Sequence, residues 1–374
     1  MSLFARSDDS LIARWWWTVD RWLLVMIALL LGAGLLLNFA ASPPVAERLA
    51  LPPMHFVKRQ GVFLIPCLFI MAGLSFLSPR GVRRLAIVSL PAALLALAAT
   101  LLVGAEIKGA SRWLQLGPFT LQPSEFVKPL FIVVAGWLLA AQMDDPRVPG
   151  RAVVAGLFAL IAAMLALQPD FGQLVLITAI LIAQLAIAGL PMVWLGLTGA
   201  AGLMGVAAAY ATMPHVASRI DRFVNPNAGD TYQVDKAISA FQAGGLIGRG
   251  PGEGEIKRAL PDAHTDYIFA VAGEEFGVIA CLGLIAAFGV IVIRGLSFLA
   301  EEEDPFVMIA GSSLFMLFGT QALINLGVTL ALMPAKGMTL PFISYGGSSL
   351  LALAVTMGMI LALTRCNRFA RGCR

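Results

Sequence analysis

Long apolar stretches dominate the sequence, and short polar segments separate them from one end of the chain to the other. Runs of about 18 or more apolar residues with few charges are typical of transmembrane helices. The pattern predicts about ten such spans, and therefore an all-α polytopic membrane protein. The predicted spans are residues 22–41, 61–77, 85–103, 124–142, 152–168, 173–189, 192–212, 267–294, 306–332 and 349–365.

The longest polar interruption lies between the seventh and eighth predicted spans, over residues 213–266. It contains scattered charges and a glycine-rich run, Gly244–Gly252. This run is only superficially similar to a phosphate-cradling loop, because no strand–turn–helix context supports that interpretation. We expect a large loop with short amphipathic helices, in which the glycine-rich run is a flexible surface segment that serves as a hinge or cover.

Arginine and lysine residues in the short loops indicate the orientation in the membrane. Placing the N-terminus in the cytoplasm puts most of these cations there, and an even number of spans returns the C-terminus to the same side. Residues 1–21 are then a cytoplasmic segment, 22–365 the transmembrane domain and 366–374 a cytoplasmic tail. The large loop is extracytoplasmic under this assignment. The other polar and glycine-rich loops of interest share that side, so we expect function to face outward.

Composition agrees with the span pattern. Hydrophobic residues make up 59% of the chain and charged residues 13%, whereas soluble proteins carry about 25% charged residues. The net charge of +4 comes from cations scattered singly along loops, so the sequence gives no sign of a nucleic-acid partner. The four cysteines show neither metal-ligand spacing nor a disulfide framework.

Asp266 is the sharpest catalytic candidate, because it lies where the large polar loop meets the eighth span. An acidic side chain at the mouth of a span is costly unless it is solvated or paired, so it is a functional hypothesis by default. His264 and Thr265 precede it and could tune its pKa by hydrogen bonding. The alternative is a helix N-cap, since Asp or Thr often caps the first turn of a helix. The sequence leaves both interpretations open.

Two adjacent carboxylates, Glu274 and Glu275, lie inside the eighth predicted span. They cannot both face lipid, so at least one must meet a partner or a polar cavity. The alternatives are an internal salt bridge or a protonated structural glutamate. We expect a structural role for one of them, without deciding which.

A second group of candidates surrounds the start of the fourth span and includes Arg112, Gln122, Glu125 and Lys128. Glu125 and Lys128 are three residues apart at a helix start and would share one face. Arg112 and Lys128 suit the oxygens of a diphosphate by charge and, for arginine, by the geometry of its guanidinium fork. Snorkelling of Lys128 to the headgroups and a local ion pair with Glu125 explain the pattern equally well.

Polar and helix-breaking residues also interrupt two apolar segments. Met333–Ser349 contains prolines, glycines, Lys336 and Ser344; irregular backbone at membrane depth is tolerated where it lines a cavity or is buried in protein. A re-entrant turn with no ligand is the alternative, although Lys336 favours an anion nearby. Gln168–Gly172 either lines the same outer cavity or ends a helix.

Taken together, these motifs resemble the SEDS family (shape, elongation, division and sporulation), the polytopic glycosyltransferases of bacterial wall synthesis. The resemblance covers nearly the whole chain, and it follows the division branch more closely than the elongation branch. The motifs that carry it occur in the family's order and are Gly109–Trp113, Gln122–Glu125, Gln168–Gly172, Ala263–Asp266, Gly273–Glu275 with Gly277, and Pro341–Ser349.

The resemblance implies polymerisation of lipid II at the outer face of the bacterial cytoplasmic membrane, at the division septum for this branch. By motif position, Asp266 is the catalytic residue. A diphosphate leaves without needing a proton, so one carboxylate acting as general base and nearby cations would suffice. A divalent cation could help to bind the diphosphate; the spacing of ligand-type residues does not decide this. The residues placed at the substrate are Arg112, Gln122, Glu125, Lys128, His264, Thr265, Lys336 and Ser344.

The resemblance also implies a partner, a class B penicillin-binding protein, which for the division branch is the transpeptidase FtsI. Other divisome proteins would act as activators, and the lipid-facing surfaces of the eighth and ninth spans are the expected docking place. Two hypotheses from other classes stay open, a lipid II flippase and a scaffold that recruits the transpeptidase. The gathering of motifs on one face favours the enzyme.

Overall fold

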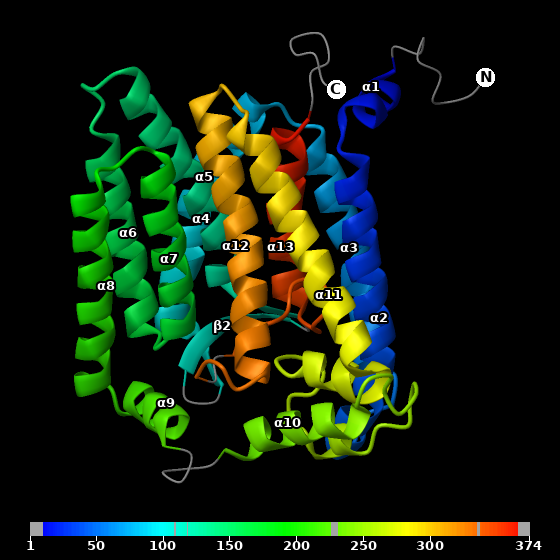
Figure 1. Ribbon diagram of the computed structural model, residues 1–374. Helices are drawn as coiled ribbons and strands as arrows, with labels where there is room; N and C mark the ends of the chain where they lie inside the picture. The colour runs from blue at the N-terminus through cyan, green and yellow to red at the C-terminus, as the bar shows by residue number, and fades with distance from the viewer. Residues whose placement is uncertain (1–9, 108–109, 118, 226–230, 335–336, 366–374) are drawn as a thin grey trace.

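A computed structural model of the chain describes residues 10–107, 110–117, 119–225, 231–334 and 337–365. The fold is a bundle of apolar helices whose long axes run roughly side by side (Figure 1). Eight helices of the described chain are long and apolar enough to cross a membrane. They are α2 (Arg21–Arg48), α3 (His55–Ser75), α4 (Pro79–Val103), α5 (Pro123–Asp144), α6 (Gly150–Leu167), α8 (Met192–Thr212), α11 (Ile268–Ala300) and α12 (Pro305–Thr329).

Two shorter apolar helices, α7 (Phe171–Ile187) and α13 (Gly347–Leu363), complete the bundle. Each of the ten predicted spans therefore corresponds to one helix, and the prediction of a polytopic helical membrane protein is confirmed. A further short helix, α1 (Leu11–Thr18), precedes α2 at the end of the bundle where α13 also ends (Figure 1). This arrangement agrees with an even number of spans. The division into a cytoplasmic segment, membrane domain and tail stays a prediction, and the tail lies outside the described residues.

The first span differs from its prediction, because α2 continues through Pro43 and Pro44 to Arg48. Proline removes a backbone donor and usually ends a helix. Here the last turns of α2 are buried, and the Ser42 hydroxyl donates to the Pro53 carbonyl 2.8 Å away. Tertiary packing of this end therefore outweighs the local preference of proline.

The middle of the bundle consists of α5, α12 and α13. The most apolar window of α12 is 78% buried, whereas that of α8 is only 6% buried, so α8 lies at the lipid-facing edge. α12 also buries polar side chains, among them Gln321, Asn325 and Thr329. Polar groups inside a membrane protein are stabilised by interhelical hydrogen bonds. The buried polar face of α12 is therefore the place to look for chemistry.

The segment between α4 and α5, predicted as a polar loop, folds into a small antiparallel sheet of order β1-β2-β3. Its strands are β1 (Ala105–Ile107), β2 (Ala110–Leu116) and β3 (Phe119–Leu121). Leu114 lies opposite Leu121, and Gln115 opposite Thr120. The sheet lies near the lower end of the bundle in Figure 1. Arg112 of β2 donates to the carbonyls of Gln168 and Pro169 at the turn between α6 and α7.

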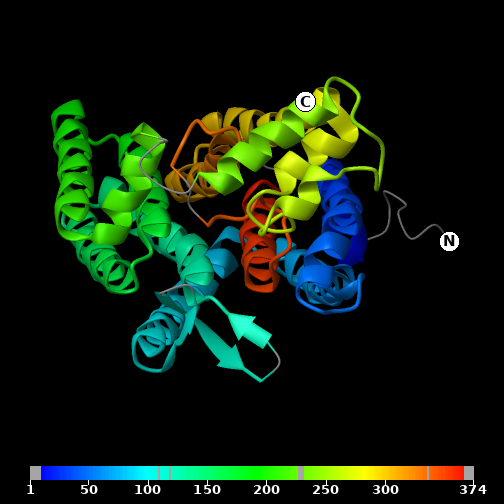
Figure 2. The same ribbon diagram turned by 90° about the horizontal axis from the view of Figure 1, so that it is seen from below.

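The large loop covers the same end of the bundle as the sheet (Figure 2). As expected, it contains short helices, α9 (Pro214–Val224) and α10 (Tyr232–Gly244), followed by a 3-10 turn, η2 (Ile256–Ala259). α10 packs along α11, with Ala237 and Ala240 fully buried. The loop is therefore a folded cap on the bundle.

Candidate functional site

The backbone carbonyl groups of His264, Thr265 and Asp266 each accept at least one hydrogen bond. The Tyr345 N–H donates to the His264 carbonyl over 2.9 Å, and the Ser344 hydroxyl donates to that of Thr265. The Asp266 carbonyl accepts from Asn325 Nδ2 at 2.9 Å and from the Thr329 hydroxyl at 3.4 Å. The tripeptide at the end of the large loop is thus fixed to α12 and to the segment before α13.

Asp266 does not cap a helix. The residue at the N-cap of α11 is Tyr267, and it makes no side-chain cap hydrogen bond. The Asp266 side chain is half-buried instead, and its Oδ2 lies 3.4 Å from where a Cβ on Gly337 would be. The structure therefore removes the capping alternative and turns the carboxylate toward the segment before α13. Lys336, which we placed in this site, lies outside the described residues.

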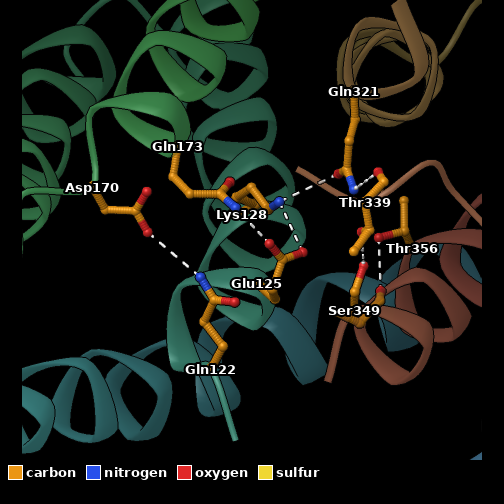
Figure 3. Close-up of polar contacts among 10 residues, drawn as sticks. Gln122, Glu125, Lys128, Asp170, Gln173, Gln321, Thr339, Ser349 and Thr356 are labelled. Atoms are coloured by element: carbon orange, nitrogen blue, oxygen red, sulfur yellow. Dashed lines mark hydrogen bonds and ion pairs between the residues drawn. The ribbon is translucent and has the colours of Figure 1, made fainter. Parts of the chain in front are cut away.

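Glu125 and Lys128 form the centre of a buried polar network inside the bundle (Figure 3). Lys128 Nζ lies 2.9 Å from Glu125 Oε2, and both side chains are almost wholly buried. Gln173 of α7 donates to the other Glu125 oxygen, and Lys128 also donates to Gln321 Oε1 of α12 at 3.3 Å. The predicted ion pair is confirmed, and snorkelling of Lys128 to the headgroups is wrong.

One face of α12 connects this network to Asp266. Gln321 Nε2 donates to the Thr339 carbonyl at 3.3 Å, and Asn325, one turn later, donates to the carbonyls of Met338 and Asp266. Residues four apart lie on the same helix face. The network and Asp266 therefore share the wall formed by α12 and residues 337–340.

Arg112 and Gln122 are directed toward the turn between α6 and α7. Arg112 donates from Nε to the Gln168 carbonyl at 3.3 Å, donates to that of Pro169, and lies 3.6 Å from Asp170 Oδ1. Gln122 Nε2 approaches the other Asp170 oxygen at 3.5 Å (Figure 3). The Gln168–Gly172 motif therefore joins this site as well as ending a helix.

The side chains of His264, Thr265 and Ser344 all contact neighbouring groups within the protein. The His264 ring packs on Phe56 with a centroid separation of 4.3 Å and on Tyr345 at 5.4 Å. The Ser344 hydroxyl accepts from the Leu340 N–H at 2.8 Å while it donates to Thr265. The Ser344 hydroxyl therefore acts as donor and as acceptor within the protein. We assign Ser344 to holding Asp266 in place.

Sequence reasoning missed several site residues. Gln173, Gln321 and Asn325 are single amides within apolar helices, and only their buried position could have indicated a role. Arg219 of α9 was passed over as one of the scattered charges in the large loop. Burial, and next the nearby Arg112, lower the pKa of Arg219, while Asp170 and Asp266 act in the opposite direction. α9 therefore brings a further cation into the electrostatic range of the site.

Glu274 and Glu275 are both structural, which decides the question that the sequence left open. Glu275 pairs with Lys257, and both side chains are buried. The two oxygens of Glu274 accept the backbone N–H groups of Ile256 and Lys257 at 2.7 and 2.8 Å. These contacts fasten the large loop to α11.

The glycine-rich run packs on a break in α11 at Gly277, where φ is 77° and ψ is −178°. In an unbroken helix, Val278 and Ile279 would donate to the carbonyls of residues 274 and 275. Here their N–H groups donate to the carbonyls of Gly245 and Leu246. The vacated carbonyls accept from the N–H groups of residues 249 and 250. The run lies at the surface as expected, with Leu246 and Ile247 exposed, but it is bonded to α11 through its backbone. Its role as a hinge or cover stays a prediction.

The described part of the chain contains no group of three or more His, Cys, Asp or Glu side chains arranged to hold a metal ion. The groups that meet at the site are the half-buried carboxylate of Asp266, the buried carboxylates of Glu125 and Asp170, and several amides and cations. A contribution from a divalent cation stays an untested hypothesis.

The sequence of this chain is similar to a protein family and to named proteins. Residues 21–369 match the family model FtsW/RodA/SpoVE, described as "Cell cycle protein". The chain is 46% identical to a Caulobacter vibrioides protein named "Probable peptidoglycan glycosyltransferase FtsW", over 97% of this chain and 93% of the relative. An Escherichia coli protein of the same name is 34% identical, over 99% of this chain and 92% of the relative.

Solved structures give the same result. One chain from a study of "polymerization and crosslinking by a peptidoglycan synthase complex" superposes with a TM-score of 0.75 and 29% identity, over 92% of this chain and 97% of that one. The Thermus thermophilus rod shape determining protein RodA superposes with a TM-score of 0.70 and 28% identity, over 93% and 97%. On this evidence the chain belongs to the FtsW/RodA/SpoVE family of cell cycle proteins.

Proposed function

We propose that this protein is a peptidoglycan glycosyltransferase that polymerises lipid II at the outer face of the cytoplasmic membrane. The observation that carries the proposal is the Asp266 carboxylate, which is half-buried and whose backbone is fixed to α12 by Asn325 and Thr329. A carboxylate carried on a positioned backbone segment is suited to general base catalysis. The names of the FtsW relatives support the same activity.

In the proposed reaction, the 4-hydroxyl of one molecule's N-acetylglucosamine attacks C1 of the N-acetylmuramic acid at the reducing end of the growing glycan. Asp266 accepts the hydroxyl proton as the new C–O bond forms. The bond from C1 to the diphosphate breaks, and undecaprenyl diphosphate leaves with the electron pair. Because a diphosphate is stable as an anion, it needs cations rather than an acid.

The cations proposed for the diphosphate are Arg112, Lys128 and Lys336. Lys128 uses two of its three N–H donors on Glu125 and Gln321, which leaves one for substrate. Arg112 is held toward the α6–α7 turn by Asp170, which orients its guanidinium. We propose Gln122 and Glu125 as the neighbours that position these cations.

We further propose that the protein acts at the division septum together with a class B penicillin-binding protein. Support comes from the FtsW names of the relatives and from the similarity to a chain of a peptidoglycan synthase complex. Of the eighth and ninth spans, we propose α11, the eighth, as the docking surface for the partner's transmembrane helix. Its most apolar window is 22% buried, whereas that of α12 is 78% buried and offers little free surface.

The test uses purified protein with labelled lipid II, with and without its transpeptidase partner, and glycan chains are separated on a gel. Wild-type protein should form chains, and Asp266→Ala should form none while keeping its elution profile and partner binding. Asp262→Asn is the matched control, because Asp262 lies in the same loop and accepts a hydrogen bond from Gln233. Full polymerisation by Asp266→Ala would remove this residue from the mechanism. Transport of lipid II across vesicles by a variant that cannot polymerise would favour the flippase.

A further inference from the structure

A second site candidate lies at the end of the bundle opposite Asp266. It is a cavity of about 370 Å³ between the first turn of α4, the last two turns of α5 and the first turn of α12. The other ends of these three helices face the catalytic candidate. α12 is 25 residues long, and at about 1.5 Å per residue the two sites are separated by most of a bilayer. The proposed reaction does not use this cavity.

Two arginines of α4 line one side of the cavity. Arg83 is half-buried and lies over the Trp137 ring, 5.6 Å from its centroid, and Arg80 lies one turn earlier and is exposed. Among the described ion pairs and hydrogen bonds, neither guanidinium has a carboxylate partner. The two guanidinium groups are therefore available to an anion from outside the chain.

Two acids line the same cavity, and they differ in their contacts. Asp304 caps α12, with its carboxylate accepting the N–H groups of Phe306 at 2.9 Å and Val307 at 3.4 Å. Asp144 ends α5, is exposed and makes no ion pair within the described chain. The cavity thus has two cations on one side and two carboxylates on the other, and of these carboxylates only Asp144 makes no hydrogen bond or ion pair within the described chain.

The direction of the helices adds to the positive side. α4 and α12 begin at the cavity and α5 ends there, so two partial positive charges and one partial negative charge face it, and an anion beside the starts of α4 and α12 is favoured. Trp137 and Phe306 supply apolar surface beside these charges. Tryptophan is typical of the boundary between hydrocarbon and water. A ligand for this cavity should therefore carry a phosphate, an amine and an apolar body.

We propose that the cavity binds the headgroup of an aminophospholipid from the adjacent leaflet. Arg80 and Arg83 would bind the phosphodiester, because guanidinium forks match phosphate oxygens. Asp144 would bind the ammonium group, and Trp137 and Phe306 would pack on the glycerol and the first acyl carbons. The volume lies within the range of about 300–1,000 Å³ usual for small-molecule sites. An anionic phosphatidylglycerol satisfies the arginines but leaves Asp144 without a partner.

The test is native mass spectrometry of the full-length protein in detergent with added lipids, in which the adduct mass identifies the bound species. Wild-type protein should retain phosphatidylethanolamine in preference to phosphatidylglycerol and phosphatidylcholine at equal concentrations. Asp144→Asn should reduce the ratio of phosphatidylethanolamine to phosphatidylglycerol about tenfold, since one charge-assisted contact is lost. Arg83→Gln should weaken both lipids. Arg84→Gln is the matched control, because Arg84 is exposed on the same helix and outside the cavity lining.

Three results would overturn the proposal. Equal retention of all three lipids by wild-type protein would mean nonspecific binding. A preference for phosphatidylglycerol that Asp144→Asn leaves unchanged would assign the cavity to anionic lipids. Displacement of bound lipid by free phosphoethanolamine or inorganic phosphate at equal concentration would identify a soluble ligand as the occupant. Asp144→Asn tests the proposal even if Arg83→Gln fails to fold, because Asp144 is exposed at a helix end.

Discussion

The protein buries two pairs of glutamate and lysine, and the two pairs have different surroundings. Glu125 and Lys128 lie within one helix, and their remaining partners are the neutral amides of Gln173 and Gln321 on two other helices. Lys257 and Glu275 join the large loop to α11, and the neighbouring Glu274 bonds to the loop backbone. The first pair lies among side chains that reach toward Asp266, and the second fastens one segment to another.

This difference teaches that burial of a charge pair does not by itself indicate catalysis. A buried ion pair gains little net stability, because removing both charges from water offsets their attraction. Removing only one partner is much worse, since it leaves an uncompensated charge. We therefore expect the pair between loop and helix to affect mainly folding, and the pair within α5 to affect mainly polymerisation.

The largest expected effect is that of Lys257→Met, which leaves the fully buried Glu275 without its cation. It should lower the free energy of unfolding by about 3–5 kcal/mol. Denaturant unfolding in detergent micelles measures this free energy of unfolding. The double variant Lys257→Met/Glu275→Met is the control and should recover most of the loss and retain polymerisation. Equal losses in the single and double variants would contradict a role for the uncompensated charge.

The second largest expected effect is on the rate of lipid II polymerisation and comes from the Glu125–Lys128 pair. Glu125→Gln/Lys128→Met removes both charges of the α5 pair while keeping a hydrogen-bonding side chain for Gln173. The protein should stay folded, and its rate of lipid II polymerisation should fall about 10²–10³-fold, as for removal of a group that stabilises developing charge. Chain formation on gels gives the rate. A fall no larger than that of the Lys257/Glu275 double variant would make the two pairs equivalent.

The third expected effect is on stability and concerns Gly277, at the break in α11 close to the Lys257–Glu275 pair. An alanine at Gly277 would need a φ of 77° with ψ near 180°, and its Cβ would lie 2.4 Å from the Leu246 carbonyl oxygen. The backbone conformation alone costs about 1–3 kcal/mol for a residue with a side chain, so Gly277→Ala should lower the thermal midpoint. Gly283→Ala is the control on the same helix, because no atom lies within 4 Å of its added Cβ. It should be neutral or slightly stabilising.

The smallest effect concerns a third pair, Arg249 and Glu255, on the surface of the glycine-rich segment. Their side chains are 40% and 82% exposed and 3.6 Å apart. Exposed pairs contribute about 0–1 kcal/mol, so Arg249→Gln should change the thermal midpoint little. A large loss would show that the Arg249 side chain, which also donates to the Ala243 carbonyl, contributes to the stability of the loop beyond its backbone N–H.

The sequence by itself determined the ten helices, because each is an apolar run long enough to follow from composition and length alone. It also indicated Asp266 and the ion pair of Glu125 and Lys128, since charges at such positions are costly without a role. The break at Gly277 was not predicted, because it depends on backbone groups more than 25 residues away, at Gly245 and Leu246. The small sheet was also missed, because β1 and β3 have only three residues each, too few to show alternation.

Only the tertiary structure decided which charges meet. Arg112 pairs with Asp170, Glu275 with Lys257, and Asn325 reaches the carbonyl of Asp266. These partners are far apart in the chain and lie on different elements. In an apolar bundle, each buried polar group is stabilised only by the partner that packing brings within hydrogen-bonding distance. A residue's own sequence neighbourhood can show that a partner is needed, but the packing of the helices selects which one.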